Sequence, residues 1–351
     1  LRCAEAIGIE GAVARTVLPR EQIQRFYALF ADTEKCVTVY SQGVNQSRSG
    51  TDKVNAILNC HLFTGRIGRP GMGPFSVTGQ PNAMGGREVG GLANQLACHM
   101  ALDNETHRGI VRDFWRSPRI AWRDGLKAVE LFDAIHIGDV KAVWIMGTNP
   151  ADSLPNAAKV VEALDRCAFT VVSDVMRVTD TIRHADVLLP AAAWGEKSGT
   201  VTNSERRISR QKPFLPMPGE ARADWRIICD VAQRMGFGAA FEFGSGADIF
   251  REYAGLSAAG NGGQRDFDIG GLADISDTGY DELAPVQWPV RRDAAPGPWD
   301  QRFFADGRFF TATGKAQMVP TPLPDAVYAD EIQLVLNSGR VRDHWHTMTR
   351  T

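Results

Sequence analysis

The sequence of 351 residues lacks long apolar runs, an excess of charge of one sign, and clustered cysteines. No stretch approaches the ~18 consecutive apolar residues of a membrane-spanning helix, so the sequence predicts no such helix. The 39 basic and 41 acidic residues leave a formal net charge of −2, which gives no general attraction to nucleic acid or to an anionic membrane. We therefore expect neither nucleic acid nor a membrane among its partners.

The six cysteines stand far apart, and there is no Cys-x-x-Cys pair. Structural zinc and iron–sulfur sites need clustered thiolates, so we expect neither within these residues. Scattered cysteines are typical of a reducing compartment, where a free Cys behaves as a small core residue. The sequence begins at Leu1 without a signal-peptide pattern and stops at Thr351 just after a strand-like segment. These features predict an internal part of a longer cytoplasmic protein.

What the chain does contain is typical of a globular α/β protein. Hydrophobic residues make up 44% and charged residues 23%, and the length predicts two or more domains. Residues 140–146 and 169–173 read as apolar strands joined by a helix at 156–166, and 185–190 reads as a further strand. Apolar strands with a crossover helix predict a doubly wound parallel sheet covered on both faces.

Periodicity predicts the remaining elements less sharply. We expect helices at 19–32, from about 51, at 125–138 and at 224–235, strands at 36–40 and 331–336, a hairpin at 303–310 around Asp306-Gly307, and loop-rich chain beyond 236.

The loop from 65 to 91 is rich in glycine and has almost no helical or strand period. Glycine lets the backbone approach other groups closely, so tertiary contacts or a ligand must fix this loop. Arg87 within it has two interpretations. It could receive a small oxyanion through paired hydrogen bonds, or it could bind loop carbonyls as a structural residue.

Two predicted strand ends carry polar residues. Gly147-Thr148-Asn149-Pro150 follows the first strand, and Ser173-Asp174 follows the second. Ligands bind at the carboxyl edge of open parallel sheets, but the chain has no G-x-G-x-x-G motif, so the usual NAD site is not predicted. Taken alone, the Gly-Thr-Asn-Pro turn is an ordinary turn between a strand and a helix.

Basic residues follow the predicted strand at 185–190, at Lys197 and Arg206-Arg207. These residues suit a phosphate-rich ligand or a solvated surface. Near the end, His344 and His346 would share one face of a strand. Without a third and fourth ligand nearby, they do not predict a metal site.

Several strings resemble, in this order, the molybdopterin oxidoreductases of the dimethyl sulfoxide reductase superfamily. They are GVNQS (43–47), GTDK (50–53), TGRIGRPGMG (64–73), TGQPNAMGGREVG (78–90), PGEARADW (218–225) and SGRVRDHWHTMT (338–349). Within that superfamily the strings are most similar to the catalytic subunit of assimilatory nitrate reductases, and the resemblance covers nearly the whole chain.

The resemblance implies a molybdenum bound by two molybdopterin guanine dinucleotides. Gln42 and Gln46 would lie at the pterin near the metal, and a second group would meet the guanosine and phosphates. A third group near the end of the chain would wrap a pterin. The second group is Asn149, Ser173, Asp174, Lys197 and Asp224, and the third is Ser338, Gly339, Arg340, His344, His346 and Thr347.

The resemblance also implies a substrate site and a reaction. Arg87 would help to hold nitrate in the substrate funnel, with Gln80 and Glu88 close by. The longer enzyme would reduce nitrate to nitrite, with electrons arriving through a [4Fe–4S] centre from ferredoxin, flavodoxin or an NAD(P)H-dependent reductase subunit. The chain lacks the cysteine motifs of that centre and of the molybdenum ligand, so we expect these 351 residues alone to be inactive.

Two alternatives to a nitrate reductase stay open. One is a formate dehydrogenase of the same superfamily, and the other is a non-catalytic structural relative. The resemblance further implies a domain plan. It comprises the later part of an α/β domain (1–103), the second half of a dinucleotide-binding α/β domain (104–235), a loop-rich connection (236–325), and the start of a C-terminal double-psi β-barrel-like domain (326–351).

Overall fold

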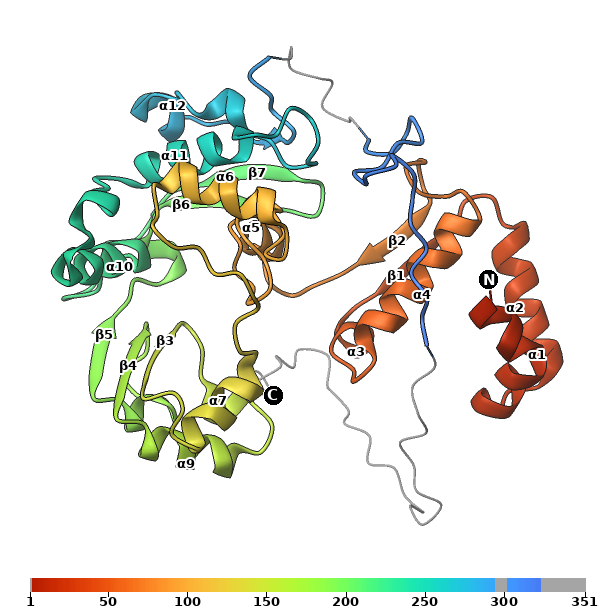
Figure 1. The fold of residues 1–351 in the computed structure, drawn as a ribbon, viewed down its shortest axis with the longest axis horizontal. Helices are drawn as coiled ribbons and strands as arrows, with labels where there is room; N and C mark the ends of the chain where they lie inside the picture. The colour runs from red at the N-terminus through yellow and green to blue at the C-terminus, as the bar shows by residue number, and fades with distance from the viewer. Residues whose placement is uncertain (1, 294–301, 323–351) are drawn as a thin grey trace. The chain divides into compact units, whose positions relative to one another are not determined.

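The computed structural model describes residues 2–293 and 302–322 (Figure 1). The described part of the chain divides into two compact units, one formed by residues 2–81 with 302–322 and the other by residues 82–293. No described helix has the length and apolar character needed to cross a membrane.

The first unit contains a short parallel sheet backed by a helix. Its elements are α1 (Arg2–Thr16), α2 (Arg20–Asp32), β1 (Val37–Tyr40), α3 (Gln42–Asn45), α4 (Gly50–Phe63) and β2 (Gly73–Ser76). Strands β1 and β2 pair in parallel from Val37↔Gly73 to Tyr40↔Ser76. Thr38 faces α4, where its Oγ1 lies 2.8 Å from His61 Nε2. The predicted helices at 19–32 and from 51, and the strand at 36–40, are confirmed.

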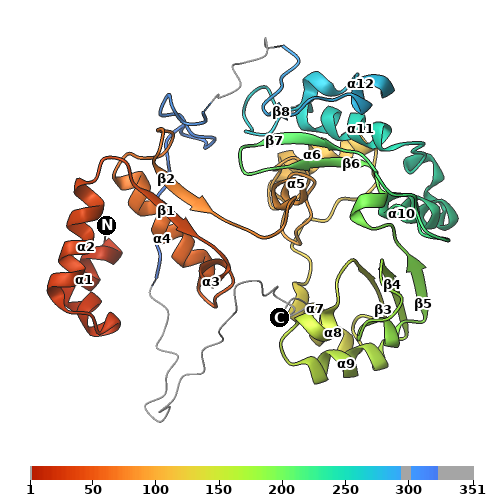
Figure 2. The same ribbon diagram turned by 180° about the vertical axis from the view of Figure 1, so that it is seen from behind.

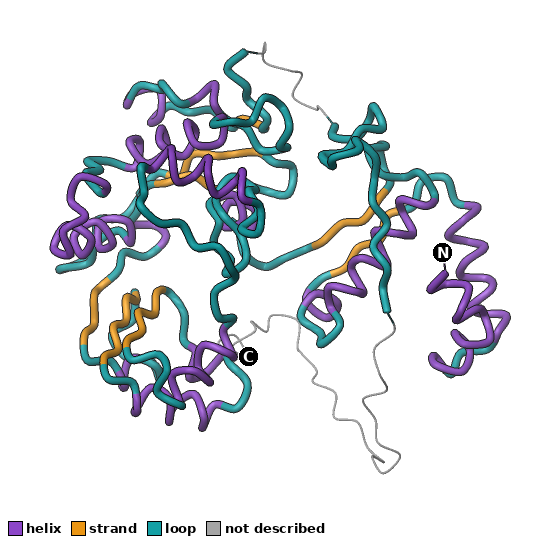
Figure 3. Tube along the Cα trace, in the orientation of Figure 1, coloured by secondary structure: helices purple, strands orange, loops and turns teal. Residues whose placement is uncertain are grey.

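The predicted loop at 65–91 contains β2 and a short helix at Ala83–Glu88, so only parts of it are loop. Its first part, residues 65–72, is the glycine-rich loop of this unit and is fixed partly by tertiary contact. Gly68 has φ +80°, and a Cβ atom there would lie 2.6 Å from the Phe304 carbonyl carbon and oxygen. The segment from 302 to 310 therefore packs directly on the loop. That segment forms a turn, closed by the Gly307 N–H donating to the Phe304 carbonyl at 3.0 Å. No strand flanks the turn in residues 302–322 (Figure 3), so the predicted hairpin is wrong.

The second unit contains a parallel sheet in the order β3-β4-β5. Strands β3 (Ala142–Met146), β4 (Phe169–Asp174) and β5 (Val187–Pro190) are in parallel register, and α9 (Ala157–Arg166) makes the crossover. Short α8 (Pro150–Ser153) precedes α9, and α7 (Ala128–His136) packs beside α9. The core between them consists of apolar residues from these helices and strands, including Phe132, Ile135, Ile145, Val160, Leu164 and Val172. The predicted β-α-β unit is confirmed.

An antiparallel sheet and several helices complete this unit. The strands are β6 (Gly199–Thr202), β7 (Arg207–Gln211) and β8 (Val286–Gln287), and the helices are α5 (Ala83–Glu88), α6 (Glu105–Trp115), α10 (Asp224–Ala232), α11 (Gly246–Ala258) and α12 (Asp277–Asp281). Short 3-10 turns lie at Ile182–His184, Trp194–Glu196, Gly238–Ala240 and Gly270–Leu272, and a π turn at Gln233–Phe237. Figures 1 and 2 both show α5 and α6 beside the β6–β7 pair.

The prediction of loop-rich chain beyond residue 236 is wrong for one segment. Helix α11 occupies the thirteen residues Gly246–Ala258. Ser245 caps the helix by accepting a hydrogen bond from the Asp248 N–H, and a Ser cap satisfies one of the free N–H groups of a helix start. The expected strand at 331–336 and the C-terminal domain at 326–351 lie outside the described residues.

Residues 82–103 pack with the second unit in this chain. The expected boundary near residue 103 concerns the domain plan of the longer enzymes and stays a prediction.

Candidate functional site

Asn149 joins the loop after β3 to the loop after β4 at the carboxyl edge of the parallel sheet. It follows β3, and its side-chain Oδ1 accepts hydrogen bonds from the Thr181 N–H at 3.1 Å and the Thr181 hydroxyl at 2.6 Å. The Thr181 Oγ1 accepts in turn from the Ala151 N–H at 3.1 Å. Thr181 is fully buried and was not identified from the sequence. Nothing in the sequence around Thr181 marks it, because its partners are 30 and 32 residues away.

The two residues at the end of β4 face different surroundings. Ser173 is fully buried, and its Oγ accepts a hydrogen bond from Trp144 Nε1 at 2.8 Å. Asp174 is half-buried, and its Oδ1 accepts from the Met176 N–H at 2.8 Å. Among the described residues Asp174 Oδ2 has no hydrogen-bond partner. Asp174 therefore offers a carboxylate oxygen at the sheet edge, whereas the Ser173 hydroxyl is buried and bonded to Trp144.

Lys197 and Asp224 form an ion pair beyond the end of β5. The Lys197 Nζ donates to Asp224 Oδ2 at 2.6 Å, and the side chains are 32% and 38% exposed. Asp224 reaches this edge because the chain at Arg222 pairs in parallel with Ala191, just after β5. Solvent screening leaves such a pair little net stabilisation, so both groups can exchange partners readily. The positive and the negative group are also both within reach of an entering ligand.

The sheet edge therefore gathers Asn149, Asp174, Lys197 and Asp224 on segments that follow three adjacent parallel strands. Their expected role as cofactor ligands stays a prediction. The backbone at Gly147 is uncovered, since a Cβ there would meet nothing within 4 Å, and its φ is +62°. The donor set fits a guanine nucleotide. A free carboxylate oxygen suits the N–H groups of the base, and a lysine suits a phosphate.

Helix α5 ends with two consecutive charged residues, one exposed and one buried. Arg87 is exposed, and its guanidinium has no hydrogen-bond or ion-pair partner among the described residues. Glu88 is 1% exposed, and its carboxylate accepts hydrogen bonds from Thr202, Tyr253 and Trp288. Burial raises the pKa of Glu88, and the three hydrogen bonds oppose that rise. Arg87 is thus open to an anion, whereas Glu88 is enclosed, and its expected place beside the substrate stays a prediction.

The expected glutamines belong to the first unit. Gln42 begins α3 after the end of β1 and is half-buried, whereas Gln46 and Gln80 are exposed. None of the three side chains has a hydrogen-bond partner in the described part of the chain. The expected residues Ser338, Gly339, Arg340, His344, His346 and Thr347 lie outside the described residues.

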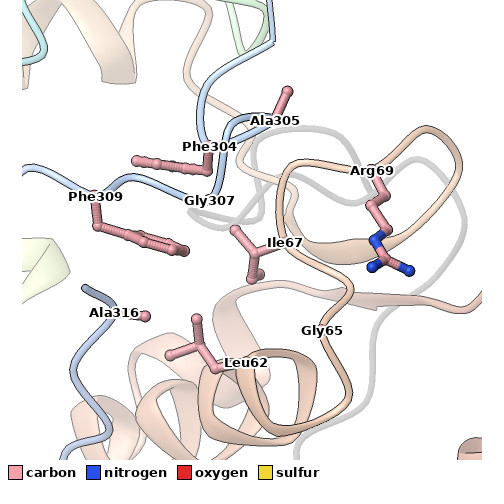
Figure 4. Close-up of a pocket in the computed structure, with 9 residues that line it drawn as sticks. All are labelled: Leu62, Gly65, Ile67, Arg69, Phe304, Ala305, Gly307, Phe309 and Ala316. Atoms are coloured by element: carbon pink, nitrogen blue, oxygen red, sulfur yellow. The ribbon is translucent and has the colours of Figure 1, made fainter. Parts of the chain in front are cut away.

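A pocket of about 250 Å³ lies in the first unit between the glycine-rich loop and the segment after residue 302 (Figure 4). The side chains of Leu62, Ile67 and Phe309 point toward it, whereas Arg69 points away. Its lining holds no acid, hydroxyl or imidazole, so it offers no group for acid–base or redox chemistry. In residues 2–293 and 302–322, no three His, Cys, Asp or Glu side chains come together as metal ligands.

Comparison with known proteins adds to this geometry. The sequence model of the molybdopterin oxidoreductase family matches residues 23–234. A nitrate reductase of Klebsiella oxytoca is 56% identical over 95% of the chain. The assimilatory nitrate reductase catalytic subunit of Bacillus subtilis is 33% identical over 99% of it. The chain spans only 38% and 48% of the lengths of these two relatives.

A solved structure supports the same fold. Acetylene hydratase from Pelobacter acetylenicus aligns with a TM-score of 0.59, covering 89% of this chain and 42% of the hydratase chain. At 14% sequence identity the alignment shows a shared fold alone. The expected α/β fold with parallel sheets is therefore confirmed.

Proposed function

The chain belongs to the molybdopterin oxidoreductases, and from this premise we propose that it is part of a cytoplasmic nitrate reductase that reduces nitrate to nitrite. The observation that carries the proposal is the gathering of Asn149, Asp174, Lys197 and Asp224 at one sheet edge. Similarity to nitrate reductases along nearly the whole chain supports nitrate as the substrate.

The cofactor is proposed to be a molybdenum with two molybdopterin guanine dinucleotides. Asp174 would accept from the guanine base, Lys197 would meet a phosphate, and Asn149 would hold the loops in place around them. Ser173 supports this edge from inside the sheet. When bound, the molybdenum centre supplies oxygen-atom transfer and two-electron exchange, while the protein supplies binding and orientation.

Other parts of the chain would meet the pterins. Gln42 and Gln46 are proposed to lie at one pterin near the metal, and their side chains lack partners among the described residues. The residues from Ser338 to Thr347 are proposed to wrap the other pterin.

Arg87 is the proposed nitrate-binding residue. Nitrate is a planar oxyanion, and a guanidinium group can donate two parallel hydrogen bonds to two of its oxygens. Arg87 is exposed and has no described partner that would compete for these donors. Gln80 is also proposed to lie in the substrate funnel. Binding of this kind orients the anion and lowers the cost of bringing it to the metal.

The longer enzyme that contains these residues is proposed to receive electrons through a [4Fe–4S] centre. Ferredoxin, flavodoxin or an NAD(P)H-dependent reductase subunit would be the donor. The 351-residue chain alone is proposed to be inactive, since its cysteines do not form the cluster that such a centre requires.

The test is the activity of the full-length enzyme purified with its cofactor. We expect molybdenum and guanine nucleotide in the protein, and nitrite formation from nitrate with reduced viologen as the donor. The isolated 351-residue chain should form no nitrite under the same conditions. Oxidation of formate without nitrate reduction would instead identify a formate dehydrogenase. A full-length protein without molybdenum would identify a non-catalytic relative.

A further inference from the structure

Helix α5 is held at both ends by a single residue of β6. The Thr202 N–H donates to Asn82 Oδ1 at 2.9 Å, at the start of α5, and the Thr202 hydroxyl lies 2.8 Å from Glu88 Oε2, at its end. A helix of six residues has too few internal hydrogen bonds to be stable alone. Its orientation is therefore set by these tertiary contacts.

Glu88 joins α5 to two further elements. Trp288 Nε1, just after β8, donates to Oε1 at 2.8 Å, and the Tyr253 hydroxyl of α11 donates to Oε2 at 3.0 Å. All three donors to the carboxylate are neutral, and their residues lie 114, 165 and 200 positions along the chain from Glu88. Leaving a buried polar group without a hydrogen-bond partner is costly, so these three bonds hold the Glu88 side chain in place.

The backbone next to Glu88 is held as well. The Cys98 N–H donates to the Glu88 carbonyl at 2.7 Å, and Gln95 Nε2 donates to the Arg87 carbonyl at 2.8 Å. The Arg87 side chain itself is exposed and has no described partner. These contacts fix the backbone at Arg87 and Glu88, and with it the direction in which the Arg87 side chain starts from the helix.

We propose that Glu88 is a positioning residue for anion binding, which fixes α5 so that Arg87 is presented to nitrate in one orientation. The inference rests on the proposed function and assigns Glu88 a role behind the substrate-binding face. Direct contact between Glu88 and nitrate is not required. A carboxylate would repel nitrate at close range, whereas the Glu88 carboxylate is buried and accepts hydrogen bonds from Thr202, Tyr253 and Trp288.

The test uses the full-length enzyme with nitrate as the varied substrate. Glu88→Gln keeps the shape of the side chain but replaces one acceptor oxygen by an amide that donates. We expect KM for nitrate to rise by about fivefold or more, with kcat within about twofold of the wild-type value, because a displaced arginine mainly weakens binding. Tyr253→Phe removes a single donor and should raise KM in the same direction by a smaller factor.

Glu252→Gln is the matched control. Glu252 also lies in this unit, and its Oε1 accepts from a tryptophan, Trp115 Nε1, at 3.0 Å. Among the described residues no hydrogen bond joins the side chains of that pair to α5, so KM for nitrate should stay at the wild-type value. A double-mutant cycle separates positioning from general destabilisation. If Glu88 acts through Arg87, Glu88→Gln should change KM much less in an Arg87→Lys enzyme than in the wild type.

Two results would overturn the inference while leaving the proposed function intact. One is an active Glu88→Gln enzyme whose KM matches that of Glu252→Gln. The other is a KM effect of equal size in the wild-type and Arg87→Lys backgrounds. If Glu88→Gln does not fold, Tyr253→Phe decides, and an unchanged KM there counts against the inference. A wild-type enzyme that forms no nitrite from nitrate would overturn both the proposed function and the inference.

Discussion

Arg66 holds the end of a helix through its guanidinium group. It is 4% exposed, and its Nη2 donates to the carbonyls of Phe30, Ala31 and Thr33 at the end of α2. The same group lies 4.5 Å from the centre of the Phe30 ring. The last carbonyls of a helix lack partners within the helix, so this arginine replaces the bonds that the helix cannot make.

Replacing Arg66 by Met should lower the free energy of unfolding by about 2–3 kcal/mol, because the hydrogen bonds from a charged group to the end of α2 are lost. The measurement is urea unfolding followed by circular dichroism. Arg69→Met in the same loop is the control, since Arg69 is exposed and its side chain has no described partner. It should change the stability by no more than about 0.5 kcal/mol. Equal effects of the two substitutions would contradict this role for Arg66.

His61 should make the stability depend on pH. It is fully buried, and burial, with a smaller contribution from the positive charge of Arg66, lowers its pKa. The unfolded chain takes up a proton near pH 6.5, whereas the folded chain resists it. Because the unfolded state then binds more protons, the free energy of unfolding should fall as the pH drops below about 6.5.

The check for His61 is a series of urea unfolding curves between about pH 5 and pH 7.5. His61→Gln should be less stable at neutral pH, because the packing against Phe30 is lost, but its stability should vary less over this range. A variant with the same pH slope as the wild type would show that other groups cause the dependence.

At the scale of elements, Gly68 permits the segment after residue 302 to pack on the glycine-rich loop. Gly68→Ala should lower the free energy of unfolding by more than about 2 kcal/mol, because the left-handed backbone is strained and Cβ would overlap the Phe304 carbonyl. Gly65→Ala is the matched control. Gly65 has φ +65° with nothing within 4 Å of a Cβ, so only the strain of about 1 kcal/mol applies.

Limited proteolysis gives a second measurement for the Gly68 variants. Gly68→Ala should make residues 302–322 more accessible to protease, whereas Gly65→Ala should not. If both variants are cut as slowly as the wild type, the close approach to Phe304 does not hold the segment.

The elements that the sequence predicts correctly are those with local causes. Strands β3, β4 and β5 and helix α9 are marked by apolar runs and helical spacing within a few residues. Their order in one parallel sheet follows from the crossover rule for such units. The strand ends, and with them Asn149 and Asp174, can therefore be placed at one edge from the sequence alone.

The elements and contacts that the sequence does not predict depend on distant partners. The burial of Glu88 needs Thr202, Tyr253 and Trp288, which have no local signal pointing to Glu88. Helix α11 is missed because glycine-rich segments on both sides suggest loop, although Ser245 and Asp248 mark its start. The hydrogen bond from Trp144 to Ser173 likewise joins residues 29 positions apart, and the expected contact of Ser173 with a ligand stays a prediction.

At the scale of the whole molecule, the two units should differ in their ability to fold when expressed alone. Residues 82–293 contain both the parallel sheet and the antiparallel sheet of their unit. Expressed alone, this fragment should unfold in one cooperative urea transition. Residues 1–81 alone should be less stable than in the full chain, because they lack the segment around Phe304 that packs on Gly68. A fragment 82–293 without a cooperative transition would contradict the division.

The anchoring of α5 also gives the enzyme an optical reporter. Trp288 is 2% exposed with its indole N–H bonded to a carboxylate, whereas Trp122 and Trp194 are 68% and 57% exposed. A buried indole emits at shorter wavelength than a hydrated one, and dissolved quenchers reach it slowly. The fluorescence that survives added iodide or acrylamide should therefore contain the signal of Trp288. Changes in that signal as an anion is titrated would show whether the Glu88 anchor responds to occupancy of the substrate site.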